Sequence, residues 1–134
     1  MRDVFVDSSA WIAFFSASDG NHPAAHAAFA RTLHRDRLFT SSLVVAEVHR
    51  LTLFRGNIRL ARAVLARMTA SDEVRVEHPS AALHAEAVTF LDRLADQAVT
   101  YTDAVSFAMM KRARCKVALT FDRHFRMAGF DTRP

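Results

Sequence analysis

The sequence contains very little cysteine, glycine or proline. Its 134 residues include three glycines, three prolines and one cysteine, Cys115, which cannot form a disulfide within the chain. A small fold held together by disulfides is therefore excluded, and long irregular or repetitive segments are not expected. Hydrophobic residues make up 51% of the chain, which is enough to form the core of one domain of this size.

Long hydrophobic runs are also absent. No stretch approaches the roughly 18 apolar residues that a membrane-spanning helix needs. The first apolar run, Val4 to Val6, is short and follows the charged residues Arg2 and Asp3, which is unlike a secretory signal peptide. We therefore expect a single globular domain over residues 1–134, located in the cytoplasm and without a membrane partner.

Lysine is scarce, because 16 of the 18 basic residues are arginine. The net charge is +4, but four of the acids are assigned below to one cleft, and the remaining surface then carries 18 basic and 10 acidic residues. A basic surface around an acidic pocket suits a polyanion such as nucleic acid, and arginine suits phosphate. The alternative is that a chain rich in alanine and arginine reflects genomic base composition alone.

Short apolar strands alternate with helical patterns along the chain. The run Val4 to Val6 suits a strand buried on both faces, as in a parallel sheet. Further strands are predicted at 38–40, 74–76 and 117–119, and helices at 8–18, 22–35, 43–54, 58–70, 82–96 and 103–114. Together they predict a three-layer α/β/α fold around a mainly parallel sheet.

Two aspartates stand directly behind predicted strands. Asp7 ends the first apolar run, and Asp122 follows the strand at 117–119. Ligands of open α/β sheets bind at the carboxyl ends of the strands, so both acids are candidates for one site. The alternative for Asp7 is that it only caps the next helix, with Ser8 or Ser9 sharing that role.

Glu47 lies within a helical apolar segment. Val44 and Leu51 stand about one turn before and one turn after it on the same side. A charged group on such a face requires either a cationic partner or a functional cleft. The alternative to a functional role is an ion pair with Arg50 or a neighbouring arginine.

Asp103 stands where a helix is predicted to begin. The helix dipole and the free N–H groups of the first turn favour a carboxylate there. Thr102 is the predicted N-cap of this helix, which would leave Asp103 free for a functional role. The residues that follow Asp103 are mostly apolar, so its side chain is not expected to lie in open solvent.

The four acids together resemble the pattern of the PIN-domain ribonucleases, especially the VapC-type toxins of bacterial toxin–antitoxin pairs. Asp7 follows the N-terminal strand, Glu47 lies in SSLVVAEVHRL, Asp103 in TYTDAVSFAMMKR and Asp122 in ALTFDRHF. Ser8 and the Thr120-x-Asp122 pattern are also similar to the family, whose hydroxyl groups support the acidic site. The resemblance covers essentially the whole chain.

This resemblance implies a PIN-like fold and an endoribonuclease that depends on Mg²⁺ or Mn²⁺. Asp7 and Asp103 are the expected direct metal ligands, and Glu47 and Asp122 complete the catalytic cluster. The chemistry is consistent, because hard divalent cations prefer oxygen ligands and keep several waters. The resemblance also implies an RNA substrate, a homodimer and neutralisation by a small VapB-type antitoxin.

Two other functions are compatible with parts of the sequence. His49 or His124 could act as general acid and base in a metal-independent ribonuclease. The seven histidines are scattered, however, and none is predicted at a strand end. A Mg²⁺-binding phospho-receiver module also gathers acids at strand ends, but it usually has a second acid beside the first-strand aspartate and a lysine where this chain has Arg123.

Overall fold

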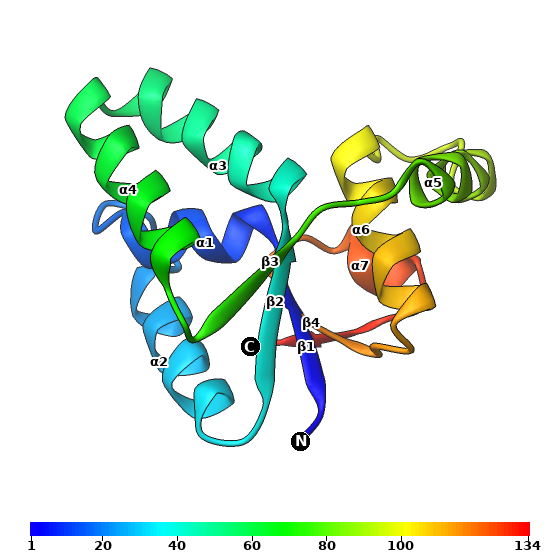
Figure 1. Ribbon diagram of the computed structural model, residues 1–134, viewed down its shortest axis with the longest axis horizontal. Helices are drawn as coiled ribbons and strands as arrows, with labels where there is room; N and C mark the ends of the chain where they lie inside the picture. The colour runs from blue at the N-terminus through cyan, green and yellow to red at the C-terminus, as the bar shows by residue number, and fades with distance from the viewer.

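Five strands form an all-parallel sheet at the centre of the molecule (Figure 1), in a computed structural model that describes residues 1–134. Their order across the sheet is β3-β2-β1-β4-β5, so the first strand of the chain is the central one. The strands are β1 (Asp3–Val6), β2 (Arg37–Ser41), β3 (Val74–Glu77), β4 (Val117–Leu119) and β5 (Asp131–Arg133).

The central strand is buried on both faces, as its unbroken apolar run predicts. Val4, Phe5 and Val6 have no exposed surface. Val4 lies beside Leu38 of β2 on one edge and beside Val117 of β4 on the other. The neighbours of β1 therefore hold its carboxyl end, and with it Asp7, at a fixed place in the middle of the sheet.

Helices cover both faces of the sheet. Figure 1 shows the first four on one side and the last three on the other, which confirms the predicted three-layer α/β/α fold. None of them is both long and apolar enough to cross a membrane. The helices are α1 (Ser8–Phe15), α2 (His22–Leu33), α3 (Ser42–Arg55), α4 (Ile58–Ala70), α5 (Ala81–Arg93), α6 (Tyr101–Arg112) and α7 (His124–Met127).

Aromatic rings join the sheet to the helix layers. Phe5 contacts Phe39 edge-on, with ring centroids 5.2 Å apart, and Phe107 of α6 contacts Phe125 of α7 edge-on at 4.9 Å. All four side chains are fully buried. Burying one such ring contributes on the order of 2 kcal/mol, and the edge-on contacts add to it. β1, α6 and α7 therefore pack into one hydrophobic core, which sets their positions relative to one another.

Three details differ from the sequence predictions. Helix α6 begins at Tyr101 with Thr100 as its N-cap, so the prediction of Thr102 in that role is wrong. The segment after Asp122, for which no element was predicted, forms α7 and β5. The helix predicted at 8–18 ends earlier, at Phe15.

Candidate active site

An open cleft of about 330 Å³ lies at the carboxyl ends of β1 and β4. All four predicted acids line it, although they come from four separate parts of the chain. Asp7 follows β1, Glu47 belongs to α3, Asp103 to α6 and Asp122 to the loop after β4. The parallel sheet brings them together because the carboxyl ends of neighbouring strands meet at one edge.

Asp7 is the most deeply buried member of the cleft, with 1% of its surface exposed. Its Oδ2 accepts hydrogen bonds from the hydroxyls of Ser9 and Thr120, each at 2.9 Å. It also caps α1 by accepting the Ser9 N–H at 3.4 Å, so capping and a place in the cleft are not alternatives. Burial raises the pKa of Asp7, while the hydroxyl contacts oppose that effect.

The same two hydroxyls tie the loop after β4 to Asp7. The Ser9 Oγ accepts the N–H of Phe121 at 2.9 Å, and the Thr120 Oγ1 accepts the N–H of Asp122 at 3.0 Å. Each hydroxyl thus donates to Asp7 and accepts from the loop backbone. Thr120 was expected in this supporting role, but Ser9 makes a closer contact than Ser8, whose hydroxyl lies 3.4 Å from Asp7.

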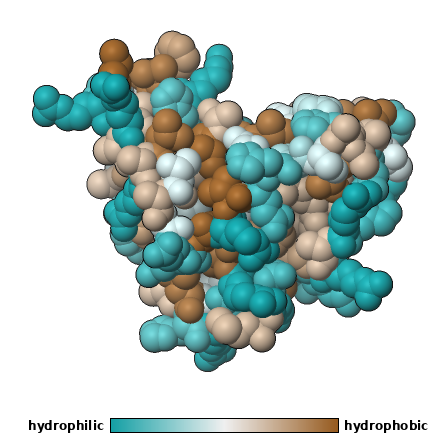
Figure 2. All heavy atoms as spheres, viewed as in Figure 1, coloured by the Kyte–Doolittle hydropathy of each residue, from teal (hydrophilic) through white to brown (hydrophobic).

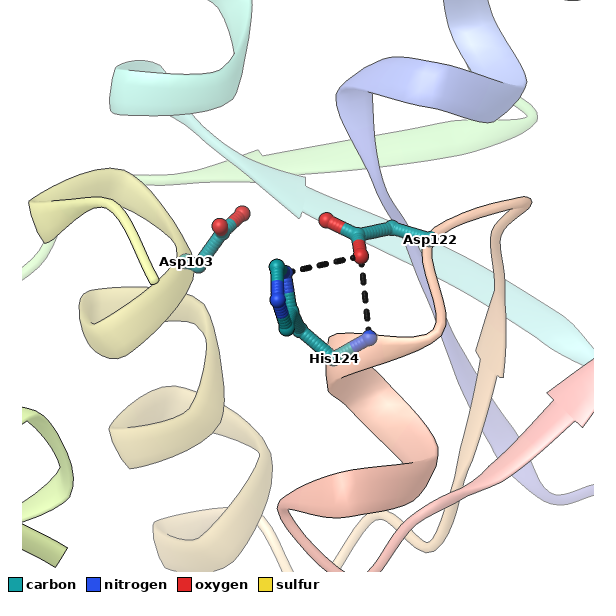
Figure 3. Close-up of side chains that lie close together, drawn as sticks. All are labelled: Asp103, Asp122 and His124. Carbon is teal, nitrogen blue, oxygen red and sulfur yellow. Dashed lines mark hydrogen bonds and ion pairs between the residues drawn. The ribbon is translucent and has the colours of Figure 1, made fainter. Parts of the chain in front are cut away.

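Asp122 forms a close pair with His124. Its Oδ1 accepts the His124 backbone N–H at 2.9 Å and lies 3.0 Å from the ring Nδ1. The carboxylate of Asp122 and the imidazole of His124 therefore lie within ion-pairing distance. Figure 3 shows Asp103, Asp122 and His124 directed toward one another, and one ligand atom of each lies within 4.8 Å of the others.

His124 also belongs to the cleft, although it was predicted only for the alternative metal-independent ribonuclease. It does not stand at a strand end, because it begins α7 after the loop that follows β4, and that loop brings it beside Asp122. The signal that could have found it is its spacing, two residues after Asp122, which allows the aspartate to bond the backbone N–H of the histidine. The other candidate, His49, is not among the residues that line the cleft.

Asp103 serves the helix and the cleft together. It forms a capping box with Thr100, in which its Oδ2 accepts the Thr100 N–H at 3.2 Å and the Thr100 hydroxyl accepts the Asp103 N–H at 3.1 Å. Only 6% of Asp103 is exposed. Burial, followed by repulsion from Asp7, raises the pKa of Asp103 to about 6.

Glu47 is half-buried, and its Oε2 has no hydrogen-bond partner. The ion pair with Arg50 that the sequence left open does not form; the guanidinium lies over the ring of Phe54, 5.5 Å from its centroid. Burial and then repulsion from Asp7 raise the pKa of Glu47. The Ser8 side chain opposes this rise, but no cation pairs with Glu47, so the position is costly for a glutamate, as predicted.

The cleft acids fit a divalent cation. Elsewhere in the protein, buried Asp36 accepts hydrogen bonds from Arg133 at 2.8 Å and Arg2 at 3.3 Å, and these contacts lower the pKa of Asp36. No arginine or lysine makes an ion pair with any of the four cleft acids. Buried carboxylates that repel one another, with an unpartnered oxygen among them, are a suitable donor set for a hard cation.

Comparison with known proteins agrees with this geometry. The PIN domain family matches residues 4–131. The 23S rRNA-specific endonuclease VapC20 of Mycobacterium tuberculosis is 36% identical over 132 residues, which cover 98% of each chain. Ribonuclease VapC26 of the same organism is 30% identical over 123 residues, which cover 91% of this chain and 89% of the relative.

Solved structures show the same fold. The crystal structure of M. tuberculosis VapC20, described as a toxin that cleaves the sarcin–ricin loop, superposes with a TM-score of 0.86 at 34% identity, over 98% of this chain and 99% of the other. VapBC2 from Rickettsia felis, bound to a DNA fragment from its promoter, gives a TM-score of 0.73 at 11% identity, over 98% and 97%. At that identity the second likeness concerns the fold alone.

Proposed function

This chain belongs to the PIN-domain family, and from that membership we propose that it is a VapC-type endoribonuclease that hydrolyses RNA with the help of Mg²⁺ or Mn²⁺. The observation that carries the proposal is the cleft at the ends of β1 and β4, where four acids converge without an arginine or lysine partner. The names of the relatives VapC20 and VapC26 support RNA as the substrate class.

The carboxylates are the proposed metal-binding groups. Asp7 and Asp103 are proposed as direct ligands, and Asp122 joins them because its oxygen lies close to those of Asp103. Glu47 completes the cluster through water or at a second metal position. A divalent cation bound here would offset the phosphate charge and help a water molecule to lose its proton.

Individual side chains of the cleft have the other roles in the proposed reaction. Glu47, with its unpartnered Oε2, accepts a proton from the attacking water as the water oxygen bonds to phosphorus. The P–O bond to the leaving sugar oxygen breaks, and that oxygen takes a proton from solvent water. His124 positions Asp122 by holding one of its carboxylate oxygens. Ser9 and Thr120 position Asp7 in the same way.

Two macromolecular partners follow from the family. We propose that a small VapB-type antitoxin binds this protein and blocks the cleft, which agrees with the toxin–antitoxin complexes among its structural relatives. We also propose a homodimer, as the family resemblance implies. Size-exclusion chromatography with light scattering, on the protein alone and with the product of an adjoining small reading frame, tests both.

Glu47→Gln tests the proposed reaction. The change keeps the size of the side chain and removes its charge, so cleavage of a single-stranded RNA in Mg²⁺ or Mn²⁺ should fall at least about a hundredfold while the melting temperature is maintained. Arg50→Gln is the matched control, because Arg50 is exposed one turn away and outside the cleft. If the Glu47→Gln protein is unfolded, Glu47 has a structural role in the fold instead of the proposed catalytic one.

One alternative has an observation of its own. His124 lies in the cleft beside Asp122, so a metal-independent ribonuclease that uses this histidine is the second candidate. Excess EDTA separates the two: it should abolish cleavage if the carboxylates hold a required cation and leave it unchanged if His124 is the only catalyst.

A further inference from the structure

A second hollow of about 330 Å³ adjoins the acid cleft, between α1 and the ends of α3 and α4 that meet at the hairpin turn. We call it the side groove. Residues of α1, of the loop after α1 and of the α3–α4 hairpin line it. Four of these also line the acid cleft, namely Ile12, Asp19, Leu51 and Arg55. The two hollows therefore share a wall, and a bound chain can pass from one to the other.

Arg55 stands on the shared wall. It is the last residue of α3 and the only arginine or lysine that lines either hollow. None of the ion pairs of the protein includes it. Two other arginines of the α3–α4 hairpin lie over aromatic rings, Arg50 over Phe54 and Arg67 over Phe15. Arg55 is thus an exposed cation without a partner, next to a cleft whose other charged groups are mostly acidic.

The side groove has the chemical character of a base-binding pocket. Its walls are apolar at Ile12, Leu51 and Leu60, and the Ser18 hydroxyl and Asp19 carboxylate add polar groups. Sequence-specific proteins recognise single-stranded RNA by placing an unstacked base against apolar or aromatic side chains and bonding its edge to polar groups. A hollow of this size is large enough for one such base.

We propose that Arg55 binds a backbone phosphate adjacent to the one that is cleaved, and that the side groove holds the base attached to it. This inference rests on the ribonuclease function proposed above and adds the path of the RNA on one side of the cut. Arg55 is then a positioning residue, and the side groove selects which base stands at that place. A free guanidinium suits phosphate because it donates two parallel hydrogen bonds.

The outer end of the α3–α4 hairpin provides a matched control. Figure 2 shows hydrophobic and hydrophilic side chains side by side at this end, at the upper left of the view. Arg59, the second residue of α4, is exposed and lines neither hollow. Arg59→Gln therefore makes the same charge change as Arg55→Gln, on the same protrusion, away from the proposed RNA path.

The first test compares cleavage kinetics of the two variants on a fluorescein-labelled single-stranded RNA pool of mixed sequence, with Mn²⁺. Arg55→Gln should raise KM at least about tenfold with a smaller change in kcat, since a lost phosphate contact weakens binding more than chemistry. The slope of log RNA affinity against log salt concentration should also become less negative, by about 0.7. Arg59→Gln should change KM less than about twofold.

The second test concerns the choice of base. Leu60→Trp fills the side groove with a bulky ring at a partly exposed position. Sequencing of the cleaved pool should show that the parent prefers certain bases at one position beside the cut, and that Leu60→Trp loses this preference. Thermal melting checks that both variants are folded.

The outcomes separate this inference from the proposed function. A parent protein that cleaves no RNA with Mg²⁺ or Mn²⁺ would remove both. If the parent cleaves and Asp103→Asn does not, but Arg55→Gln behaves like Arg59→Gln, the nuclease stands and the role of Arg55 is refuted. An unchanged base preference in Leu60→Trp would refute the base-binding role of the side groove. The groove would then be a candidate binding site for a protein partner.

Discussion

Asp103 has two roles in the structure, one in the N-terminal turn of α6 and one in the acid cleft, and they affect its carboxylate in opposite ways. Its carboxylate stabilises the first turn of α6 by accepting the Thr100 N–H. The same carboxylate is buried near Asp7, and these surroundings raise its pKa to about 6 from an ordinary value of 3.8. Without a cation, the folded protein therefore binds a proton at Asp103 more tightly than the unfolded chain does.

Metal-free protein should consequently lose stability as the pH rises from about 4 to about 7. Between the unfolded and folded pKa values, the native state carries the extra proton, so the free energy of unfolding decreases with pH. The shift of Asp103 corresponds to a loss on the order of 3 kcal/mol. Asp7 and Glu47 have raised pKa values and act in the same direction. Urea unfolding in EDTA at several pH values measures this; stability that rises over the range would contradict it.

Asp103→Asn should have opposite effects on stability and activity. The asparagine oxygen can still accept the Thr100 N–H, while one negative charge leaves a crowded cluster. At pH 7.5 without metal, the variant should melt no lower than the parent. Mg²⁺ should raise the melting temperature of the parent clearly and that of the variant much less, because only the complete site binds the cation. Cleavage of RNA should be lost.

The outcome that contradicts this prediction is specific. If Asp103→Asn is clearly destabilised in EDTA, and if both proteins ignore Mg²⁺, then Asp103 is a helix cap without a metal role. Differential scanning fluorimetry with and without Mg²⁺ decides between the two.

At the scale of helices and strands, the sequence was sufficient for most of the architecture. Four strands and six helices were predicted close to their observed positions. Each of them buries apolar residues in the core, and the spacing of those residues along the sequence differs between strands and helices. Convergence of the four acids was also predictable, since strand ends and a helix start in a parallel sheet share one edge.

The sequence predictions were wrong or incomplete where short-range contacts of individual side chains determine the structure. Thr100 and Thr102 are both plausible caps by residue type, and only the three-residue spacing of Thr100 and Asp103 distinguishes the capping box. Strand β5 was missed because it is a short, charged edge strand, Asp131–Arg133, without an apolar pattern. His124 was not predicted beside the four acids, because its place depends on the turn that Asp122 makes.

Thr100→Ala should weaken the start of α6. The Thr100 hydroxyl accepts the Asp103 N–H, and loss of an N-cap costs about 1 kcal/mol of stability. Because the same contact fixes Asp103, the variant should also need more Mg²⁺ for half-maximal cleavage. Thr102→Ala is the control: its hydroxyl does not cap the helix, so we expect a change within about 0.5 kcal/mol. Equal effects of the two changes in urea unfolding would refute this assignment of the cap.

For the whole molecule, charge is divided between a basic surface and an acidic cleft. Apart from Asp7, Glu47, Asp103 and Asp122, the chain has 18 basic and 10 acidic residues. Such a surface attracts a polyanion over a distance set by the salt concentration. This attraction acts even though the acidic cleft itself repels phosphate in the absence of a cation.

RNA affinity should therefore fall steeply with salt. If about four phosphates are neutralised on binding, the slope of log affinity against log salt for a single strand is about −3. Fluorescence anisotropy of a labelled RNA with the inactive Asp103→Asn protein, between 50 and 300 mM KCl, gives the slope without cleavage. A slope near zero would mean that the basic residues do not contact the RNA backbone.

In this domain the strand that is synthesised first, β1, is the central one. β1 pairs with β2 on one edge and with β4 on the other, so the second edge stays open until β4 has been made. Asp7 and the Thr120 hydroxyl that holds it are 113 residues apart. A nascent chain therefore has neither a closed sheet nor a complete acid cleft. The order of synthesis thus delays the assembled cleft until β4 and Thr120 have been made.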